Sequence, residues 1–413
     1  MIDKNRIALL GYGGTTKAIA NYLGDNCRFF DDNAKESYID ELNNSIYPSK
    51  EYKGESFDFA IPSPGIFPTS PLIKNSKKII SEYDFFLSNE GVAKDKLPFN
   101  IWISGTNGKT TTTQMLTHLL KSKGAQSGGN IGTPLAKLDS NAPIWVLETS
   151  SFTLHYTNYA VPNIYLLLPI TPDHLDWHGG SENYIADKLK PLKYMKEGEL
   201  ALVPKGLPLP KSSAWIVEYE TIADLEEFFN IEASKIRFKG AFLLDAMLAL
   251  SVTKALFEEV DYKLINSFNI GEHRQEELKD AIGRVWVNDS KATNTDASLE
   301  AIKVYQDKKI HLILGGDDKG VDLSDFFKEL KNYNLEIYAI GSNAQKIANL
   351  AKDSNIVCTK CNFLDKALSE IDKKHTLDTV ALLAPAASSL DQFSSYAKRG
   401  SDFKEFVAKL SFD

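Results

Sequence analysis

A short stretch of the chain, "GTNGKTT" at residues 105–111, combines glycine, lysine and hydroxyl side chains in a spacing that suits a phosphate group. An apolar run precedes it and a helical pattern follows, so backbone N–H groups at the start of a helix would face the phosphate. The common phosphate-binding loop, G-x-x-x-x-G-K-[ST], would need a glycine where this chain has Ile103. The spacing therefore predicts a shorter loop that begins at Gly105, with Ile103 in the preceding strand.

Side chains of this loop and of the next apolar strand are suited to bind a nucleotide with its metal ion. Lys109 is placed to reach the β- and γ-phosphates, and the hydroxyl of Thr110 is placed to bind Mg²⁺. The strand "IWVLETS" ends in Glu148, and in phosphate-loop folds a carboxylate at a neighbouring strand end completes the Mg²⁺ shell. The predicted nucleotide-binding residues of the loop are Gly105, Thr106, Asn107, Gly108, Lys109, Thr110 and Thr111.

A second group of polar residues follows the apolar strand "NIYLLLPIT". It contains Asp173, His174, Asp176 and His178. Neutral imidazole and carboxylate oxygen together suit a metal ion or a polarised phosphate. Because this strand is expected in the same sheet as the phosphate loop, His174 is a candidate metal ligand.

Another glycine turn lies near the N-terminus, where Gly11 and Gly13 follow an apolar strand. The dinucleotide-binding fingerprint G-x-G-x-x-G needs a third glycine, and this chain has Thr16 there. Asp31 and Asp32 follow the next strand about 20 residues on, at the position of a ribose-binding carboxylate. A nucleotide-binding turn and a plain turn between strand and helix both remain open, but the missing glycine argues against an NAD-dependent dehydrogenase.

These motifs need a scaffold of parallel strands to bring them together. Apolar runs alternate with helical patterns throughout the chain, which is typical of α/β domains with mostly parallel sheets. In such folds, ligands bind at the edge where the carboxyl ends of the strands meet. We predict three domains, at residues 1–96, 97–270 and 271–413. The first and third are expected to be Rossmann-like and the central one to resemble a P-loop ATPase.

Composition narrows the class of protein. Of 413 residues, 43% are hydrophobic and 25% are charged, which is ordinary for a globular protein with a full core. The net charge of −8 argues against a general affinity for nucleic acid, which needs a basic face. No apolar run approaches the ~18 residues of a membrane span, and the N-terminus lacks a cleavage site. We therefore expect a cytoplasmic protein.

Three cysteines, Cys27, Cys358 and Cys361, are too few for a disulfide framework. Cys358 and Cys361 form a C-x-x-C, but a zinc ribbon needs a second pair, which the chain lacks. Reduced thiols are therefore favoured over a redox or metal-binding role.

Nine motifs along the chain resemble those of one protein family. In chain order they are "GTNGKTT", "NIGTP", "LETSSFTL", "TPDHLDWHG", "YIADKLK", "GEHRQE", "NDSKATN", "LGGDDKG" and "APAASSLDQF". Together they are similar to the motifs of the Mur ligase family, and they span all three predicted domains. The resemblance implies that the domains bind, in turn, a UDP-sugar precursor, ATP and an amino acid.

The resemblance implies an ATP-dependent acid–D-amino-acid ligase that adds D-glutamate to UDP-N-acetylmuramoyl-L-alanine. Such a reaction belongs to peptidoglycan precursor synthesis and serves cell-wall growth, cell division and cell shape. The alanine carboxylate would attack the γ-phosphate of ATP, and the D-glutamate amine would then attack the resulting acyl phosphate. Because two anions must approach each other, the site needs dense positive charge. By resemblance, Lys109 and two Mg²⁺ ions supply it.

The resemblance also implies the ligands of these ions, which are Thr110, Glu148, His174 and a modified lysine, Lys188. In the family, CO₂ converts the matching lysine into a carbamate, which binds Mg²⁺ as a carboxylate does. Carbamylation needs a neutral amine, so burial or nearby cations must lower the pKa of Lys188. The implied catalytic residues are Lys109, Glu148, His174 and Lys188.

The remaining site residues are assigned by the motifs that they occupy. The implied contacts to the UDP precursor are Gly14, Thr15, Thr16, Ser63, Asn130 and His174. The implied ATP contacts beyond the loop are Asp245, Arg274, Asp289 and Lys291. The implied D-glutamate pocket consists of Thr293, Lys319, Ser389, Leu390 and Tyr396, in which Lys319 would pair with a carboxylate.

Two segments depart from the family pattern. The ATP-binding helix usually opens with His-Asn and a further Asn, but here Phe242 and Asp245 stand near the two Asn positions. Because Phe242 cannot hydrogen-bond adenine or ribose, we expect a different contact to the base and a weaker affinity for ATP. The segment "DDNAKES" lacks the usual basic residue for the uridine diphosphate, so that contact stays unassigned.

Other functions stay open on the sequence alone. A sister ligase for a diamino acid would carry an Asp-Asn-Pro-Arg signature, which the chain lacks, and a folylpolyglutamate synthase normally lacks the N-terminal domain. A P-loop nucleotide switch would hydrolyse ATP without an amino acid, and an NAD-binding oxidoreductase would depend on Gly11 and Gly13. We expect a monomer that binds neither nucleic acid nor a membrane.

Overall fold

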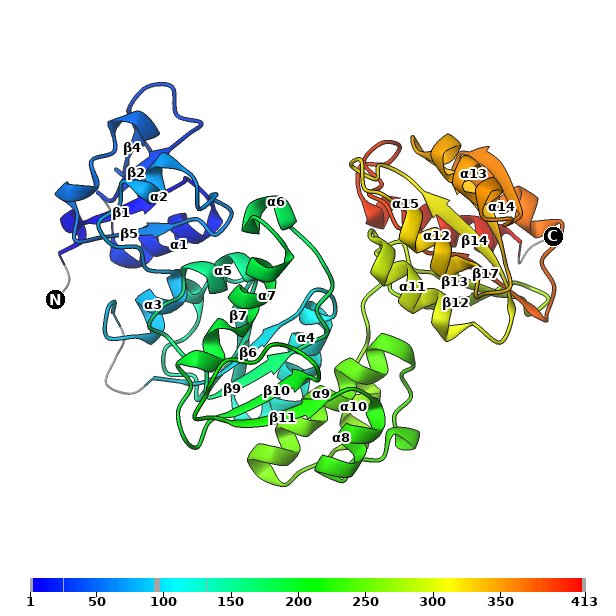
Figure 1. Cartoon of the computed structure of the whole chain (residues 1–413), viewed down its shortest axis with the longest axis horizontal. Helices are drawn as coiled ribbons and strands as arrows, with labels where there is room; N and C mark the ends of the chain where they lie inside the picture. The colour runs from blue at the N-terminus through cyan, green and yellow to red at the C-terminus, as the bar shows by residue number, and fades with distance from the viewer. Residues whose placement is uncertain (1–2, 25, 93–96, 131, 411–413) are drawn as a thin grey trace. The chain divides into compact units, whose positions relative to one another are not determined.

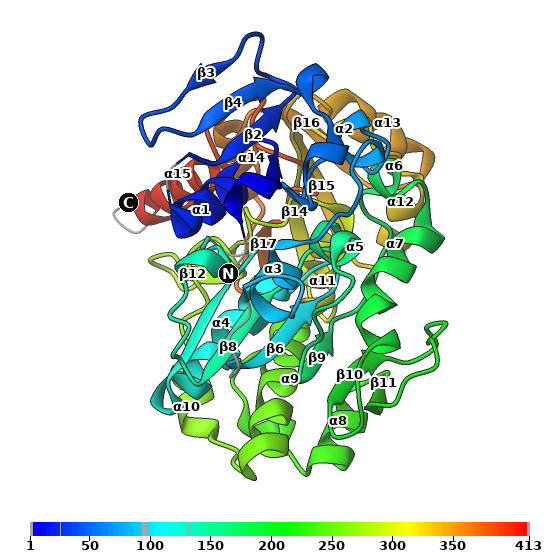
Figure 2. The same cartoon turned by 90° about the vertical axis from the view of Figure 1, so that its left-hand side faces the viewer.

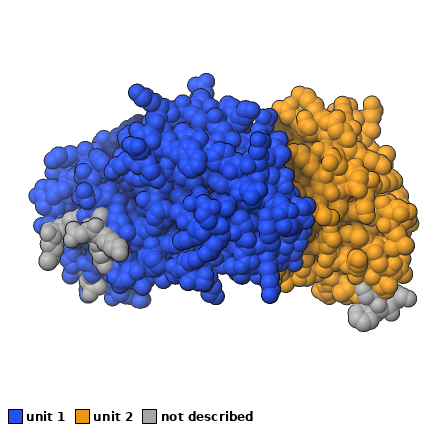
Figure 3. Space-filling view, turned by 90° about the horizontal axis from the view of Figure 1, so that it is seen from below, with its two compact units in different colours: residues 1–238, 242–268 blue, residues 239–241, 269–413 orange. Residues whose placement is uncertain are grey.

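The computed structural model describes residues 3–24, 26–92, 97–130 and 132–410, and the chain divides into two compact units (Figures 1 and 3). One unit comprises residues 1–238 and 242–268, and the other residues 239–241 and 269–413. The first unit contains two sheets and the second unit one, all mainly parallel, so the predicted α/β class is confirmed. The predicted domain boundary at residue 96 lies outside the described residues, and the three domain ranges stay predictions.

The N-terminal sheet has the strand order β3-β4-β2-β1-β5. Its strands are β1 (Ile7–Leu10), β2 (Arg28–Asp31), β3 (Tyr38–Ile39), β4 (Ser45–Pro48) and β5 (Phe59–Pro62). Strand β3 runs antiparallel to β4, and the other pairs are parallel. Helix α1 (Gly14–Leu23) follows β1, and α2 (Pro71–Lys74) follows β5. The apolar strand predicted before the turn with Gly11 and Gly13 is therefore present, as β1.

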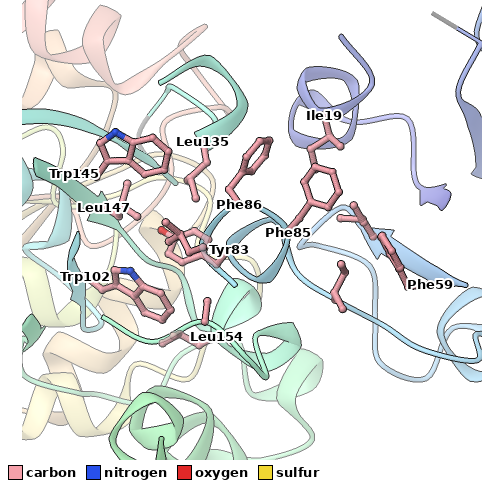
Figure 4. Packing of buried hydrophobic residues seen from close by; sticks show 14 of the residues in the cluster. Ile19, Phe59, Tyr83, Phe85, Phe86, Trp102, Leu135, Trp145, Leu147 and Leu154 are labelled. Carbon is pink, nitrogen blue, oxygen red and sulfur yellow. The ribbon is translucent and has the colours of Figure 1, made fainter. Parts of the chain in front are cut away.

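Helix α3 (Glu82–Leu87) joins the cores of the N-terminal and central sheets, and all six of its residues are buried. Figure 4 shows Phe85 beside Ile19 of α1, while Tyr83 lies beside Trp102 of the central sheet. The rings of Tyr83 and Trp102 meet edge to face at 4.8 Å. One hydrophobic core therefore continues through α3 from the first sheet to the second.

The central sheet has the order β11-β10-β9-β6-β8-β7, and all its pairs are parallel (Figure 2). Its strands are β6 (Phe99–Ser104), β7 (Ala125–Gly129), β8 (Ile144–Glu148), β9 (Ile164–Leu167), β10 (Leu200–Pro204) and β11 (Trp215–Tyr219). The helices are α4 (Lys109–Leu120), α5 (Ser151–Tyr156), α6 (Leu175–His178), α7 (Ser181–Leu189), α8 (Ile222–Phe229), α9 (Gly240–Phe257) and α10 (Tyr262–Ser267). Because β6 lies between β8 and β9, the motifs that follow these three strands meet at one edge.

Helix α9 is, within the described residues, the one helix long and apolar enough to cross a membrane by length and composition. Half of it is buried, and residues 245–253 form a continuous buried run. Core helices pass the same test, so this is weak evidence for a membrane span. Within the run, Asp245 accepts a hydrogen bond of 2.9 Å from Thr112 of α4. This contact ties α9 to the phosphate-loop helix.

The second unit holds one sheet, of order β12-β13-β17-β14-β15-β16, in which only the pairing of β12 with β13 is antiparallel. Its strands are β12 (Glu276–Lys279), β13 (Val285–Asn288), β14 (Lys309–Gly315), β15 (Leu335–Ile340), β16 (Cys358–Asn362) and β17 (Thr379–Leu383). The helices are α11 (Thr295–Val304), α12 (Ser324–Leu330), α13 (Ala344–Asp353), α14 (Leu364–Asp372) and α15 (Tyr396–Lys409). The mostly parallel sheet predicted for this region is therefore present.

Cys358 and Cys361 lie at the first and fourth positions of β16 as free thiols. Burial raises the pKa of each thiol to about 11. A thiol with such a pKa is protonated at neutral pH and is a weak nucleophile and metal ligand. This agrees with the preference for reduced thiols.

Candidate functional site

The loop between β6 and α4 has the backbone of a close-fitting phosphate loop. Ile103 lies inside β6, as predicted, and Gly105 is the first residue after the strand. Gly105 has a φ of +142°, and a Cβ on it would lie 2.4 Å from the Cβ of Leu168. Gly108 has a φ of +81° and caps the start of α4. Glycine is needed at both positions because other residues rarely adopt a positive φ.

Lys109 folds back over this loop. Its Nζ donates hydrogen bonds to the carbonyl oxygens of Gly105, at 3.0 Å, and Thr106, at 2.8 Å. Burial lowers the pKa of Lys109, although the carboxylates of Glu148 and Asp173 act in the opposite direction. The lysine is therefore held at the loop, where phosphates would be expected.

Glu148, at the end of β8, is the carboxylate nearest the loop hydroxyls. Its Oε2 accepts a hydrogen bond of 2.9 Å from Thr110, and its Oε1 accepts one of 2.9 Å from the side chain of Asn130. Its carbonyl oxygen accepts a hydrogen bond of 3.1 Å from the hydroxyl of Tyr83. A hydroxyl and a carboxylate at this separation are hard oxygen donors, and they fit a Mg²⁺ ion that keeps water molecules in its shell.

Lys188, on α7, is almost completely buried beneath the loop. Its Nζ donates a hydrogen bond of 2.7 Å to the carbonyl oxygen of Gly105 and lies 3.4 Å from Oγ of Ser104. Burial, with a further contribution from the nearby Lys109 ammonium, lowers the pKa of Lys188 well below its ordinary value. A neutral amine is the form that reacts with CO₂, so this environment suits carbamylation.

His174 contacts residues other than Glu148 and Lys188. It adopts a φ of +52° as the residue before α6, and half of its side chain is exposed. Its Nε2 lies 3.4 Å from Asp173 Oδ2, and its ring lies 4.7 Å from that of Phe152. Within the described residues, no hydrogen bond or ion pair joins His174 to Glu148 or Lys188. The structure thus brings the loop, Glu148 and Lys188 together, while His174 lies in the segment after β9, directly before α6.

The N-terminal glycine turn is held by its own side chains. The hydroxyl of Thr16 donates to the carbonyl oxygen of Gly11 at 2.6 Å and accepts from the N–H of Gly13 at 3.2 Å. Ser63 packs so closely that a Cβ on Gly13 would lie 2.9 Å from its Oγ. Gly14 and Thr15 open α1 beside this turn. The predicted precursor residues of this sheet, Gly14, Thr15, Thr16 and Ser63, therefore lie together at its carboxyl edge.

Asp31 has a structural partner at this edge. Its Oδ2 accepts a hydrogen bond of 2.6 Å from the N–H of Tyr12, and its Oδ1 accepts one of 2.7 Å from the N–H of Asn33. The carboxylate therefore fastens the glycine turn to the end of β2. The position of Asp31, about 20 residues after Gly11, was equally compatible with a contact to a ribose. In the structure, this carboxylate binds the N–H of Tyr12 in the glycine turn.

In the second unit, all the predicted amino-acid and ATP residues except Arg274 follow three adjacent strands, β13, β17 and β14. Backbone hydrogen bonds in both directions, each of 2.9 Å, link Asp317 to Ser388 and so join the loops that carry Lys319 and Ser389. The Nζ of Lys291 lies 4.2 Å above the ring of Tyr396. These residues therefore gather at one edge of the sheet, together with Thr293 and the exposed Leu390.

Asp289 is buried at the same edge, directly after β13. Burial raises its pKa to about 7, against the opposing effects of a backbone hydrogen bond from Gln275 and the charge of Arg274. Two of the three predicted ATP-binding residues of this unit, Arg274 and Asp289, thus interact with each other. A carboxyl with such a pKa is poised to ionise when a cation or a hydrogen-bond donor approaches.

Four neighbours of the site make contacts that the sequence reasoning did not predict. Tyr83 and Asn130 both contact Glu148, from 65 and 18 positions away in the chain. The hydroxyl of Tyr184 lies 3.0 Å from that of Thr106, and Asp245 lies below the loop, where a Cβ on Gly108 would be 2.6 Å from its Oδ1. No local pattern marks Tyr83 or Tyr184, whereas Asn130 and Asp245 were identified with other roles.

Comparison with known proteins identifies the family to which this chain belongs. Residues 103–218 match the Mur ligase middle domain. A UDP-N-acetylmuramoylalanine–D-glutamate ligase of Campylobacter jejuni is 50% identical over 408 residues, which cover 98% of this chain and 100% of that relative. The chain belongs to the Mur ligase family. A relative of the same name from Helicobacter pylori is 47% identical over 422 residues, with the same coverage of both chains.

Solved Mur ligases share the fold of this chain. The crystal structure of a MurF ligase from Thermotoga maritima in complex with ADP matches 100% of this chain and 99% of that chain, with a TM-score of 0.57. Its sequence identity of 16% makes this a likeness of fold alone. It confirms the predicted three-domain fold class. As a Mur ligase, the chain is an ATP-dependent ligase, and the nucleotide-switch and NAD-dependent alternatives are set aside.

Proposed function

We propose that this Mur ligase joins D-glutamate to UDP-N-acetylmuramoyl-L-alanine, with ATP as the energy source, in the synthesis of peptidoglycan precursors. One observation carries the proposal: the half-buried Lys109, the buried Lys188 and the carboxylate of Glu148 gather around a phosphate loop in a chain that is 50% identical to a ligase of this name. We further propose that the enzyme acts as a cytoplasmic monomer.

The phosphates of ATP would lie over the loop from Gly105 to Thr111. The N–H groups at the start of α4 and the ammonium of Lys109 would hold them, because a helix N-terminus and a lysine both favour negative charge. Lys109 would exchange its bonds to the loop carbonyl oxygens for bonds to phosphate oxygens. By resemblance to the family, Arg274, Asp289 and Lys291 would also contact ATP. Asp245 would support the loop, since a Cβ on Gly108 would lie 2.6 Å from its Oδ1.

Two Mg²⁺ ions would be held by Thr110, Glu148, His174 and the carbamate of Lys188. The oxygen donors of Thr110 and Glu148 and the depressed pKa of Lys188 support this assignment. When bound, the ions would neutralise phosphate charge and polarise the γ-phosphate. Thr110 and Asn130 each donate a hydrogen bond to the carboxylate of Glu148, and Tyr83 donates one to its backbone carbonyl oxygen. These contacts would position the carboxylate before any ion arrives.

The reaction would proceed in two steps. A carboxylate oxygen of the alanine attacks the γ-phosphorus, the bond to the β-phosphate oxygen breaks, and ADP leaves. The D-glutamate amine then attacks the acyl carbon, loses a proton, and the C–O bond breaks to release phosphate. Lys109 would offset the charge that accumulates when these anions meet, which is the largest barrier to the first step.

The substrates would bind at the edges of the other two sheets. Gly14, Thr15, Thr16, Ser63 and Asn130 would contact the UDP precursor. Lys319 would pair with a carboxylate of D-glutamate, and Thr293 and Ser389 would add hydrogen bonds. Leu390 and Tyr396 would form the apolar wall of this pocket. The loop pairing of Asp317 with Ser388 supports a common pocket for Lys319 and Ser389.

Phosphate release from ATP, measured across a matrix of UDP precursors and amino acids, tests the proposal. We expect release only when UDP-N-acetylmuramoyl-L-alanine and D-glutamate are both present with Mg²⁺. Release with another amino acid, such as a diamino acid, would assign the chain to a sister ligase. Phosphate release without any amino acid would contradict the proposal that the site catalyses amide formation.

A further inference from the structure

Two histidines and an aspartate from three helices meet in the first unit, apart from the residues assigned to the phosphate loop. The Nδ1 of His155 on α5 lies 2.9 Å from Asp187 Oδ2, and the Nδ1 of His178 on α6 lies 2.8 Å from the same oxygen. One donor atom of each of the three residues lies within 4.8 Å of the others. The sequence grouped His178 with His174, but the fold turns His178 towards α5 and α7 instead.

The surroundings of this cluster favour neutral imidazole. The side chain of His178 is fully enclosed, and the rings of Phe152, Trp177 and Tyr184 lie 4.6–5.6 Å from its own. Neutral imidazole keeps one ring nitrogen as a lone-pair donor, which is the form that binds metal ions.

Ser151 supplies the second contact that buried metal ligands usually have. Its Oγ lies 3.0 Å from the Nε2 of His178. When a metal ion replaces the proton on Nδ1, His178 can keep its proton on Nε2 and donate it to this hydroxyl, so that the Nδ1 lone pair is directed at the ion beside Asp187. A partner on the remote ring nitrogen fixes the tautomer and the ring orientation of a metal-binding histidine. The hydrogen bonds therefore hold the ring in an orientation that suits a ligand.

We propose that His155, His178 and Asp187 form a binding site for a divalent transition-metal ion of the Zn²⁺ class, separate from the magnesium site. Two imidazole nitrogens and one carboxylate oxygen are a donor set that Zn²⁺ uses when a fourth position is left open. The ring of His155 is about one-third exposed, so an ion and a water molecule can approach from its side.

The distances between the donor atoms are consistent with this assignment. Ligands about 2.0–2.1 Å from a tetrahedral Zn²⁺ stand roughly 3.3 Å from one another, so separations of 2.8 and 2.9 Å need only a small outward movement. Lys190 is a cation near Asp187, and its Nζ donates a hydrogen bond of 2.6 Å to the carbonyl oxygen of His155. Asp187 Oδ2 lies within 2.9 Å of the Nδ1 atoms of both imidazoles, so an ion at this point would meet all three donor atoms.

A bound ion would link three helices that also carry residues of the proposed active site. Helix α6 begins directly after His174, and α7 carries Lys188 one position after Asp187. The ion would hold both segments to α5. The inference does not rest on the proposed ligase reaction, because ion binding is measured without substrates.

Titration of the chelator-treated full chain with Zn²⁺ tests this site by calorimetry, and titration with Co²⁺ tests it by visible absorption. We expect one ion per chain at micromolar affinity or tighter, in the presence of millimolar Mg²⁺, and a higher unfolding temperature with Zn²⁺. His155→Gln and Asp187→Asn are expected to weaken binding at least tenfold. His118→Gln on α4 is the matched control, since His118 contacts Leu264 and Ser267 outside the cluster, and it should bind as the wild type does.

Two results would overturn the proposal. One is unchanged Zn²⁺ affinity in both His155→Gln and Asp187→Asn, with far-ultraviolet circular dichroism confirming that the variants are folded. The other is loss of Zn²⁺ binding in His174→Gln but not in His155→Gln, which would place the ion in the magnesium site. Retained binding in His174→Gln together with loss in His155→Gln would support the separate site.

Discussion

Among single residues, Glu148 connects several parts of the candidate site through hydrogen bonds. Its carboxylate accepts hydrogen bonds from Thr110 and Asn130, and its backbone carbonyl accepts one from Tyr83. Thr110 and Glu148 were predictable because a phosphate loop and a strand-end carboxylate are local patterns. Asn130 was identified as a precursor contact, and Tyr83 was not identified, because their positions relative to Glu148 depend on how distant segments pack.

Lys188→Ala tests the most unusual residue of the site. The substitution removes the amine that would carry the carbamate, and we expect turnover to fall about 10²–10³-fold, as when one charge-stabilising group is removed from an active site. Phosphate release in the presence of bicarbonate measures the effect. The exposed Lys193→Ala is the control and should keep wild-type turnover. Normal turnover of Lys188→Ala in bicarbonate-free buffer would remove Lys188 from the mechanism.

At the level of secondary-structure elements, the site depends on a strand–loop–helix unit and on the helix that braces it. The loop between β6 and α4 approaches Leu168 closely enough to exclude a side chain at Gly105. Helix α3 is buried on all sides, and its Tyr83 reaches the end of β8. These two elements set the geometry of the loop and of Glu148.

Gly105→Ala is expected to distort the phosphate loop. The new Cβ would meet Leu168 at 2.4 Å in a backbone region that alanine avoids. We expect a loss of about 1–3 kcal/mol in the free energy of unfolding, together with weaker ATP binding. Urea unfolding and nucleotide titration measure the two effects. Gly65→Ala is the matched control, because a Cβ there meets no atom within 4 Å, and equal losses in both variants would contradict this explanation.

Tyr83→Phe tests the link from α3 to Glu148. The variant keeps the ring that packs on Trp102 and removes the hydroxyl that bonds to the Glu148 carbonyl and to Thr149. We expect a loss of about 0.5–1.5 kcal/mol in the free energy of unfolding, the usual contribution of a buried hydrogen bond. Urea unfolding measures it. If turnover falls while KM for ATP stays constant, Tyr83 also positions the carboxylate, whereas unchanged stability would show that the hydroxyl contributes nothing.

For the molecule as a whole, the two units carry buried titratable groups of opposite kinds. In the second unit, burial lowers the pKa of His311 and His375 to about 4. In the first unit, burial raises the pKa of Glu82 to about 8, against two backbone hydrogen bonds that lower it. Each group is neutral in the folded unit at intermediate pH, so each unit loses stability when its own group is forced to ionise.

The second unit should lose stability on acidification. The unfolded chain protonates its histidines near their ordinary pKa of 6.5, whereas the folded unit resists protonation until about pH 4. Stability is therefore complete above pH 6.5 and falls as the pH decreases from 6.5 to 4, by up to about 3 kcal/mol for each histidine. Urea unfolding at a series of pH values measures the loss. His375→Gln should reduce the slope, and a flat profile in the wild type would contradict the assignment.

The first unit should lose stability on the alkaline side. Glu82 ionises near pH 4.5 in the unfolded chain but near pH 8 in the folded unit. Its contribution is therefore complete below pH 4.5 and is lost as the pH rises through 8. We expect Glu82→Gln to have a flatter profile of unfolding temperature between pH 6 and 9 than the wild type. Parallel profiles for the two proteins would rule out Glu82 as the group responsible.

The sequence by itself determined the parts that depend on neighbouring residues. Alternating apolar and helical patterns identified the parallel sheets, and the spacing from Gly105 to Thr111 identified the loop, because backbone geometry and hydrophobic periodicity act over short distances. Ordered motifs then identified the family, as the 50% identity to a D-glutamate ligase confirms.

Only the tertiary structure decided how distant groups combine. It turned the ring of His178 towards Asp187, which also contacts His155. It also brought Tyr83 and Asn130 into hydrogen-bonding contact with Glu148. It also buried Lys188, and that burial lowers the pKa of its amine. The physical reason is common to all these cases: hydrogen bonds, desolvation and charge interactions depend on distances in space, which residue types and their spacing along the chain do not specify.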